Sequence, residues 1–316
     1  MFRRVIGLIR QVVIGIGVAG LVYLGIVVAL NLRDTKPTEP PPALPQDRAS
    51  PDAGRPAFLP PQVHLATADC GGAGDLASAA AVNAQGMGTL AIAPFGVAEA
   101  GWQAYEPLIA RTIGTGCAGD SEGFAAKLRA WQAAHGVGAT GQLDTATMSA
   151  LALGWLKQRP FVAAMRNGCP PSPDPSRLAV AGSGEAFGGT VIMARPAALA
   201  AYRGMVAAAR HDGIAAAPLL TIASAWRGPD EELSRCIDGS CGSAGKAHCS
   251  AHRTGLAFDF VLGNGPGDAL FSTDPANRLA LSQTPAYRWL VANADRFGFV
   301  NYPYEPWHWE WTGENI

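Results

Sequence analysis

Histidine, aspartate and glutamate side chains gather in two short stretches of this 316-residue sequence, and these residue types bind metals or move protons. The first stretch, "HCSAHRTGLAFDF", holds His252 and Asp259. The second, "YEPWHWEW", holds Glu305 and His308. Two imidazoles and one carboxylate, with a fourth position left to water, are the ligand set of a catalytic rather than a structural zinc ion. The first stretch could also be a disulfide corner or a polar loop that runs into the core.

Asp259 stands in an apolar segment that predicts a buried strand. Leu256, Phe258 and Phe260 share one face of that strand, so Asp259 points to the other face. A carboxylate in such a strand is unfavourable unless it is paired, hydrogen-bonded or bound to a metal. A carboxylate held only by local hydrogen bonds is the alternative when this strand is considered alone.

The second stretch supplies partners for Asp259. Pro306 cannot donate to a central strand ladder and favours an extended chain before it, which predicts Glu305 on a loop just before the strand of His308. We therefore expect a zinc site whose ligands are His252, Asp259 and His308. Glu305 would then be free to act as general base on a water molecule.

Two neighbouring features of the second stretch are expected to be structural. Glu310 is predicted to be a solvated or paired strand residue. The alternating tryptophans predict a wall of the core: Trp307, Trp309 and Trp311.

The elements that must position these residues follow a proline-rich break at residues 169–176. Beyond it, Pro196 opens a predicted helix to about Gly213, "PLLTIASAW" predicts a strand, and a second helix is expected from Pro285 to about Phe297. Strands and helices mix without regular alternation, which predicts an α+β domain over residues 177–316, with a mixed or antiparallel sheet and flanking helices.

Residues 67–168 predict a small, mainly helical domain. Phe124, Leu128 and Trp131 form an apolar stripe of one helix, and Asp144 is expected to cap the next. The stretch "FAAKLRAWQAAHGVGATGQLDTATMSAL" resembles the peptidoglycan-binding repeat, a small helical domain found beside cell-wall hydrolases, although any pair of helices joined by a turn could share this pattern.

The N-terminal part predicts export of the rest of the chain. Within residues 1–33, the run Val12 to Leu30 has no charged residue and is long enough to cross a bilayer as a helix, and arginines precede it. We expect a single-pass anchor in a bacterial cytoplasmic membrane, with the C-terminal part outside the cytoplasm. A cleaved signal peptide ending near Ala29 is the alternative. Residues 34–66 are rich in proline and predict a stiff tether.

Composition limits the classes of partner. The chain has 48% hydrophobic and 16% charged residues and a formal net charge of -1. It lacks the basic excess that binding to a phosphate backbone requires, so we expect no nucleic-acid partner. The sequence gives no indication of an oligomeric state.

The six cysteines are expected to pair as disulfides because the chain is exported. Cys70 and Cys117 lie within one region, and Cys236, Cys241 and Cys249 crowd another. The pairing itself stays open among all the possible combinations. A structural zinc site from Cys236, Cys241, His248 and Cys249 is a further alternative, although its spacing matches no usual Cys-x-x-Cys pairing.

The two stretches also match a known pattern. "SAHRTGLAFD" fits Ser-x-His-x-x-Gly-x-Ala-x-Asp, and "EPWHW" fits the Glu-x-x-His block, of the zinc D-alanyl-D-alanine carboxypeptidases of the VanY type. The resemblance extends over roughly residues 190 to 311. It implies a small α+β zinc peptidase that cleaves D-amino acid bonds in the stem peptides of peptidoglycan.

Position by position, the resemblance implies a role for each site residue. His252, Asp259 and His308 correspond to the zinc ligands and Glu305 to the catalytic base, and His248 is a rival to His252 that does not fit the spacing. Arg227 corresponds to the arginine that stabilises the oxyanion, and Ser250 to a residue that helps to hold the substrate's peptide end. The chain departs from the family where a glutamine commonly follows the arginine, since it carries three acidic residues there: Asp230, Glu231 and Glu232.

The predicted function is zinc-dependent hydrolysis of peptidoglycan stem peptides by an exported, membrane-tethered D-alanyl-D-alanine carboxypeptidase. An endopeptidase of the same fold is the alternative within the enzyme class. Outside that class, the alternatives are a non-catalytic wall-binding scaffold and a disulfide-stabilised adhesive module without metal.

Overall fold

The computed structural model describes residues 70–71, 75–235 and 249–316. All described residues belong to one compact unit of the chain, Leu59–Ile316. The predicted anchor and tether, together with Cys236, Cys241 and His248, lie outside the described residues. Within the described ranges, no helix combines the length and the apolar character needed to span a bilayer.

The first part of the described chain is mainly helical, as predicted. A short antiparallel hairpin lies between its first two α-helices. The elements are α2 (Ala77–Thr89), β1 (Ala91–Ile92), β2 (Glu99–Ala100), α3 (Glu106–Ile113), α4 (Glu122–Ala134), α5 (Thr145–Gln158) and α6 (Pro160–Ala164).

The two central helices of this region begin at side-chain caps. Ser121 Oγ accepts a hydrogen bond from the Phe124 N–H at the start of α4, and the carboxylate of Asp144 accepts one from the Thr147 N–H at the start of α5. Each cap satisfies a backbone donor that the helix itself leaves unpaired. The predicted cap at Asp144 is therefore present, and the apolar stripe of α4 is buried at Phe124 and Leu128.

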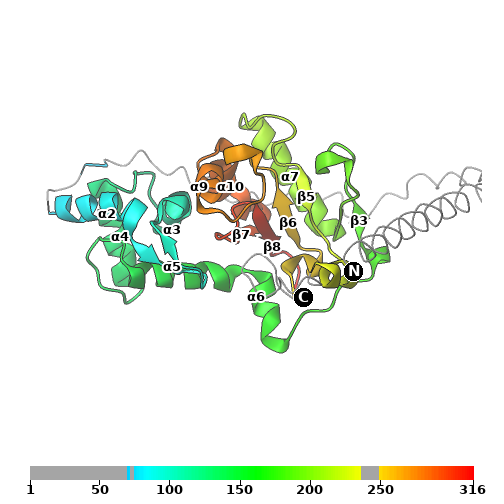
Figure 1. The fold of residues 1–316 in the computed structure, drawn as a ribbon, viewed down its shortest axis with the longest axis horizontal. Helices are drawn as coiled ribbons and strands as arrows, with labels where there is room; N and C mark the ends of the chain where they lie inside the picture. The colour runs from blue at the N-terminus through cyan, green and yellow to red at the C-terminus, as the bar shows by residue number, and fades with distance from the viewer. Residues whose placement is uncertain (1–69, 72–74, 236–248) are drawn as a thin grey trace, which may run out of the picture. The chain divides into compact units, whose positions relative to one another are not determined.

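The second part combines helices with an antiparallel sheet (Figure 1). Four strands form this sheet in the order β5-β6-β8-β7, and β3 and β4 form a separate hairpin. The elements are β3 (Ala179–Val180), β4 (Met193–Ala194), α7 (Pro196–His211), β5 (Ile222–Ser224), α8 (Pro229–Ser234), β6 (Ala257–Phe260), α9 (Pro275–Ser282), α10 (Pro285–Asn293), β7 (Phe299–Asn301) and β8 (His308–Trp311).

This mixture of helices and antiparallel strands agrees with the predicted α+β class. The strand expected in "PLLTIASAW" is shorter than predicted, because Leu220 has a left-handed backbone with φ 61° and the strand begins only after it. The helices expected from Pro196 and Pro285 are present as α7 and α10.

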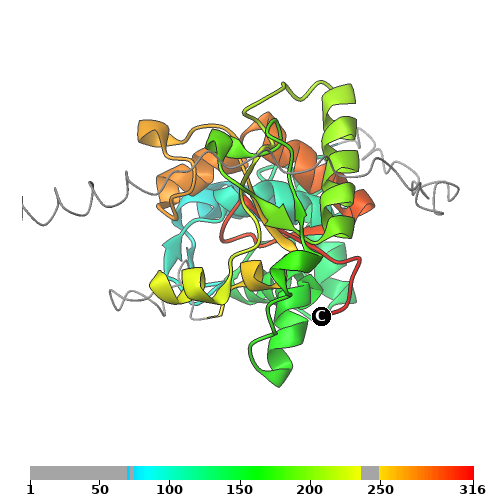
Figure 2. The same ribbon diagram turned by 90° about the vertical axis from the view of Figure 1, so that its right-hand side faces the viewer.

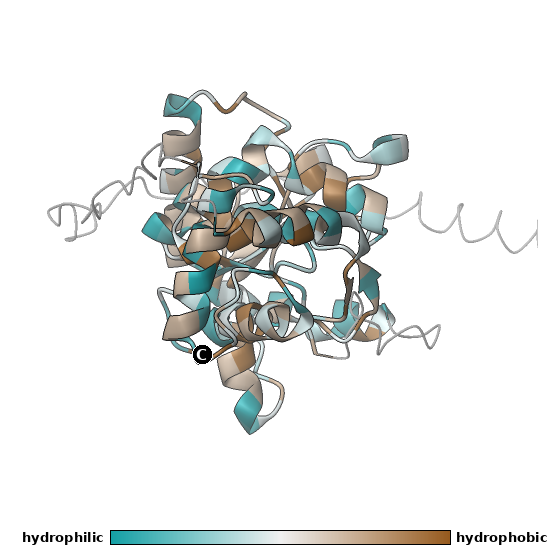
Figure 3. Cartoon of the chain, turned by 90° about the vertical axis from the view of Figure 1, so that its left-hand side faces the viewer, coloured by the Kyte–Doolittle hydropathy of each residue, from teal (hydrophilic) through white to brown (hydrophobic). Residues whose placement is uncertain are grey.

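The two faces of the sheet differ in character. Phe258 and Phe260 of β6 pack in the main core, where both rings stack against Tyr202 of α7. Ala257 and Asp259 alternate with them and lie on the opposite face. Figure 2 shows the fold turned by 90°, and Figure 3, coloured by hydropathy, shows hydrophilic and hydrophobic stretches along the helices. The face away from the core carries the polar residues considered next.

The helical region and the sheet region are joined by buried contacts. Leu108 of α3 packs against the cores of both regions. Arg278 of α9 lies 2.5 Å from Glu99 of β2, and the two side chains are 2% and 8% exposed. The domain boundaries expected from the sequence, at 67–168 and 177–316, stay a prediction.

Candidate metal centre

Two neighbouring strands bring Asp259 and His308 together. The antiparallel register of β6 and β8 sets these residues directly opposite each other. His308 Nδ1 lies 3.0 Å from one carboxylate oxygen of Asp259, and His252 Nε2 lies 3.2 Å from the other. All three side chains are buried, and one donor atom from each lies within 4.8 Å of the others. The three predicted ligands are therefore clustered, although their role as ligands stays a prediction.

His252 reaches this cluster from a short 3-10 helix, Ala251–Thr254. Ser250 Oγ accepts a hydrogen bond from the His252 N–H at its start, and Gly255 ends it with a left-handed φ of 71°, a conformation that glycine adopts without strain. The imidazole Nδ1 lies 2.6 Å from the Ala225 carbonyl oxygen. If Nδ1–H donates to that carbonyl, the lone pair of Nε2 faces Asp259, as a metal ligand requires.

Burial and close charges set the protonation of the cluster. Burial lowers the pKa of His252 to about 4, so this imidazole is neutral at neutral pH. Although burial alone would lower the pKa of His308, its contacts with Asp259 and Glu310 raise it to about 9. Burial would raise the pKa of Asp259, but the two imidazoles hold it well below its usual range. A carboxylate anion between two imidazoles fits the donor set of a catalytic zinc site.

Glu305 lies on the turn between β7 and β8, where the sequence predicted it. Its N–H donates to the Tyr302 carbonyl, and its carbonyl accepts from the His308 N–H, so the turn is tied to the start of β8. The carboxylate oxygen Oε2 lies 4.0 Å from His308 Nδ1. Burial raises the pKa of Glu305 to about 7. A carboxyl group with a pKa near neutrality suits a general base that must also return its proton.

Arg227 and Ser250 lie beside each other and line the same pocket as His252 and His308. Arg227 Nη2 donates to Ser250 Oγ at 3.1 Å. Burial lowers the pKa of Arg227, and its buried Nε has no hydrogen-bond partner among the residues that the structure describes. A guanidinium with an unused donor can bind an anion that arrives from outside the chain.

One pocket is lined by every predicted site residue except Asp259. Arg227, Ser250, His252, Glu305 and His308 line it, together with Arg159, Phe161 and Tyr302. The last three were missed by the sequence analysis. Arg159 and Phe161 come from the junction of α5 and α6, far along the chain from either motif, so no local pattern signals their approach to the site.

Glu310 was predicted to be either solvated or paired, and the structure shows that it is paired. Its oxygen Oε1 lies 2.5 Å from Arg159 Nη2. The side chains of Glu310 and Arg159 are 2% and 8% exposed. Burial would raise the pKa of Glu310, but the charge of Arg159 and the contact with His308 lower it to about 2. Glu310 was not predicted to be a neighbour of the metal centre, although strand alternation places it on the same face as His308.

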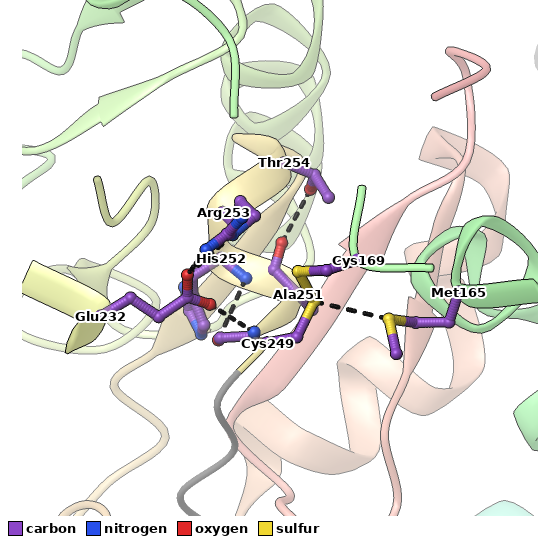
Figure 4. Close-up of a disulfide and its surroundings, with 9 residues drawn as sticks. Met165, Cys169, Glu232, Cys249, Ala251, His252, Arg253 and Thr254 are labelled. Atoms are coloured by element: carbon purple, nitrogen blue, oxygen red, sulfur yellow. Dashed lines mark hydrogen bonds and ion pairs between the residues drawn. A yellow bond between two sulfur atoms is a disulfide. The ribbon is translucent and has the colours of Figure 1, made fainter. Parts of the chain in front are cut away.

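Glu232, one of the acidic residues that depart from the family pattern, holds the loop of His252. Its side chain is almost fully buried, accepts from the Ser250 N–H and pairs with Arg253 (Figure 4). The departure therefore has a structural role here. The ion pair links Glu232 of α8 to Arg253 of the motif "SAHRTG".

The structure gives two of the disulfide pairings that the sequence left open. Cys249 pairs with Cys169, 80 residues away, and the bridge ties the segment after α6 to the loop of Ser250 and His252 (Figure 4). A disulfide sulfur carries no thiolate, so Cys249 is excluded as a zinc ligand of the alternative Cys/His site. The second described disulfide joins Cys70 and Cys117, as their common region suggested.

His252 and His308 thus line one pocket together with Glu305 and Arg227, and Asp259 lies against both imidazoles, an arrangement that could hold one metal ion. Residues 242–314 match the family model described as "VanY: D-alanyl-D-alanine carboxypeptidase". The predicted resemblance to that family is thereby confirmed for this part of the chain.

One solved structure similar to this chain is described as "Structure of the LdcB LD-carboxypeptidase reveals the molecular basis of peptidoglycan recognition" and is 25% identical to it. The match covers 46% of this chain and 72% of that chain, with a TM-score of 0.33. No curated protein matches the chain.

Proposed function

We propose that this protein is a zinc-dependent peptidase that cleaves D-amino acid bonds in the stem peptides of peptidoglycan, acting as a D-alanyl-D-alanine carboxypeptidase. The observation that carries the proposal is the buried cluster of His252, Asp259 and His308 within 4.8 Å, at a pocket that Glu305 also lines. The match of residues 242–314 to a carboxypeptidase family supports the same reaction class.

In this mechanism, His252, Asp259 and His308 would hold the zinc ion. The ion would supply Lewis acidity for the attacking water and for the scissile carbonyl. Glu305 accepts the proton of the attacking water and then delivers it to the leaving amine nitrogen, which its pKa of about 7 allows in both directions. The side chains of His252, Asp259 and His308 are buried, which limits the competition of bulk water for these groups.

Arg227 stabilises negative charge on the substrate side of the pocket. Its guanidinium keeps an unused Nε–H donor, and Ser250 fixes its orientation through Nη2. An arginine held in this way before the reaction can stabilise an oxyanion without reorganisation. Ser250 lies at the same end of the pocket, where it can contact the peptide end of the stem.

The test is to incubate the full-length protein with defined muropeptides, with and without a chelator, and to identify the products by mass. Release of the terminal D-alanine from pentapeptide stems, lost with chelator and restored by zinc, is expected. Cleavage of internal stem or cross-bridge bonds would instead identify an endopeptidase. Binding to sacculi without any cleavage would identify a scaffold, and absence of zinc from the purified protein would reject the metal site.

We propose further that the run from Val12 to Leu30 anchors the protein in the cytoplasmic membrane and that residues 67–168 bind the cell wall. The charge-free run behind arginines supports the first role, and the resemblance to the peptidoglycan-binding repeat supports the second. Fractionation of cells tests the anchor, since a retained helix keeps the full-length protein in the membrane fraction after a salt wash. Sacculus pull-down of variants in residues 67–168 tests wall binding.

A further inference from the structure

Arg159 belongs to the helical region, yet its guanidinium lies against the sheet that carries the candidate metal centre. The residue stands between α5 and α6, where Pro160 at the first position of α6 favours the extended backbone observed at Arg159. This backbone turn directs the side chain to Glu310, with Nε 2.6 Å and Nη2 2.5 Å from the same carboxylate oxygen. The Phe161 N–H donates to the other oxygen at 3.1 Å.

Glu310 in turn faces His308. Its oxygen Oε1 lies 3.4 Å from His308 Nε2, a separation longer than a normal hydrogen bond but within ion-pair range. His308 Nε2 is buried, and the structure gives it no hydrogen bond to any described residue. Because Nδ1 of the same ring faces Asp259, Nε2 must carry the proton when Nδ1 binds a metal, and Glu310 is the carboxylate that this N–H meets.

Arg159 also contacts the other neighbour of His308. Its guanidinium carbon lies 4.0 Å from the centre of the Tyr302 ring, within the range of a cation–π contact. The Tyr302 ring meets the His308 imidazole edge-on at 6.1 Å, and the Tyr302 N–H donates to the His308 carbonyl at 2.9 Å. A single guanidinium therefore holds two residues that border one predicted ligand.

We propose that Arg159 is a positioning residue of the metal centre, which holds Glu310 as the acceptor for the Nε2–H of His308. The inference rests on the proposed function, because it assigns a partner to a proposed zinc ligand. Ligating histidines generally donate their second N–H to a carboxylate or carbonyl, which fixes the ring and strengthens the ligand. Without Arg159, a buried Glu310 carboxylate would lose its cation and turn away from His308 towards water. The helical region thus completes a site whose other residues lie in the sheet region.

The test compares zinc affinity, by competition with a chromophoric chelator, and thermal unfolding for the full-length wild type and five variants. The variants are Arg159→Met, Arg159→Lys, Glu310→Gln, the double variant of Arg159→Met with Glu310→Gln, and Arg111→Met. Arg159→Met and Glu310→Gln should each weaken zinc binding 10- to 100-fold, the usual effect of removing a partner of a metal ligand. The double variant should bind zinc within about twofold of Glu310→Gln, because Arg159 acts through Glu310.

Arg111→Met is the matched control, since it removes another arginine–carboxylate contact between the two regions, with Asp295, away from the metal centre. It should leave zinc affinity unchanged. Arg159→Lys, which keeps a buried charge but not the forked donor, should weaken zinc binding less than Arg159→Met and decides the question if Arg159→Met does not fold.

The outcomes separate the two proposals. If the wild type binds no zinc, the proposed function fails and the inference with it. If the wild type binds zinc and cleaves stem peptides while Arg159→Met binds zinc equally well and only unfolds at a lower temperature, the inference alone is overturned. The inference would also be overturned if the double variant lost zinc affinity by the product of the two single-variant losses.

Discussion

At the scale of single residues, the site contains two carboxyl groups whose surroundings shift their pKa values in opposite directions. Burial raises the pKa of Glu305 to about 7, whereas two adjacent imidazoles hold the pKa of Asp259 low. One carboxyl group is thus suited to exchange protons near neutral pH and the other to remain an anionic ligand. This difference assigns distinct roles to two acidic groups in the same cluster.

Substitution of Glu305 tests its role as base. Glu305→Gln keeps the size of the side chain but removes its proton acceptor, so kcat for D-alanine release should fall by about 10²- to 10⁴-fold. Zinc content should stay stoichiometric, because Glu305 is not among the predicted ligands. Steady-state kinetics and metal analysis of the same preparation check both statements, and a variant with wild-type kcat would remove Glu305 from the mechanism.

Arg227 is expected to act on the transition state rather than on the metal. Arg227→Met removes a charged donor from a buried pocket and should lower kcat by about 10²- to 10³-fold, the effect of losing one oxyanion donor. Zinc affinity should not change. Arg177→Met, at an exposed arginine outside this pocket, serves as the control in the same assay. A loss confined to KM would show that Arg227 binds ground-state substrate instead.

At the scale of elements, the centre is assembled from two rigid strands and one tethered loop. The β6–β8 register positions Asp259 and His308, and backbone hydrogen bonds of the sheet maintain it. His252 depends on a 3-10 turn that Glu232 and the Cys169–Cys249 bridge restrain from two sides. The loop is therefore the part of the site most open to perturbation by distant changes.

The two described disulfides offer a matched comparison. Replacing Cys169 and Cys249 with alanine should destabilise the fold by about 2–5 kcal/mol and also weaken zinc binding, because the loop of His252 loses its tether. Replacing Cys70 and Cys117 should destabilise the fold but leave zinc affinity unaltered. Denaturant unfolding and zinc titration of both double variants check this, and equal zinc affinity in the two would contradict a role for the bridge at the site.

At the scale of the whole molecule, residues whose positions follow from strand alternation or helix capping could be predicted from the sequence. Residues that reach the site through tertiary contacts could not. The period of the strand around Phe258 and Phe260 correctly placed Asp259 on the opposite face, and the cap at Asp144 was also predicted correctly. Arg159 and the Cys169–Cys249 pairing could not be predicted, since each depends on how a distant segment folds back on the sheet. Glu310 could have been noticed, because two-residue periodicity already sets it beside His308.

Tertiary contacts between the helical region and the sheet region predict that the described residues 75–235 and 249–316 unfold as one unit. Arg278 pairs with Glu99, donates to the Tyr304 carbonyl and lies over the Tyr304 ring, so it joins the helical region to the turn of the metal centre. Arg278→Met leaves the Glu99 carboxylate buried without its cation and should destabilise the protein by about 3–5 kcal/mol. Arg129→Met, which removes an exposed pair with Asp75, should change stability by less than about 1 kcal/mol. Wild-type protein should show a single calorimetric transition, Arg278→Met should lower its temperature or divide it in two, and two separate transitions in the wild type would contradict the coupling.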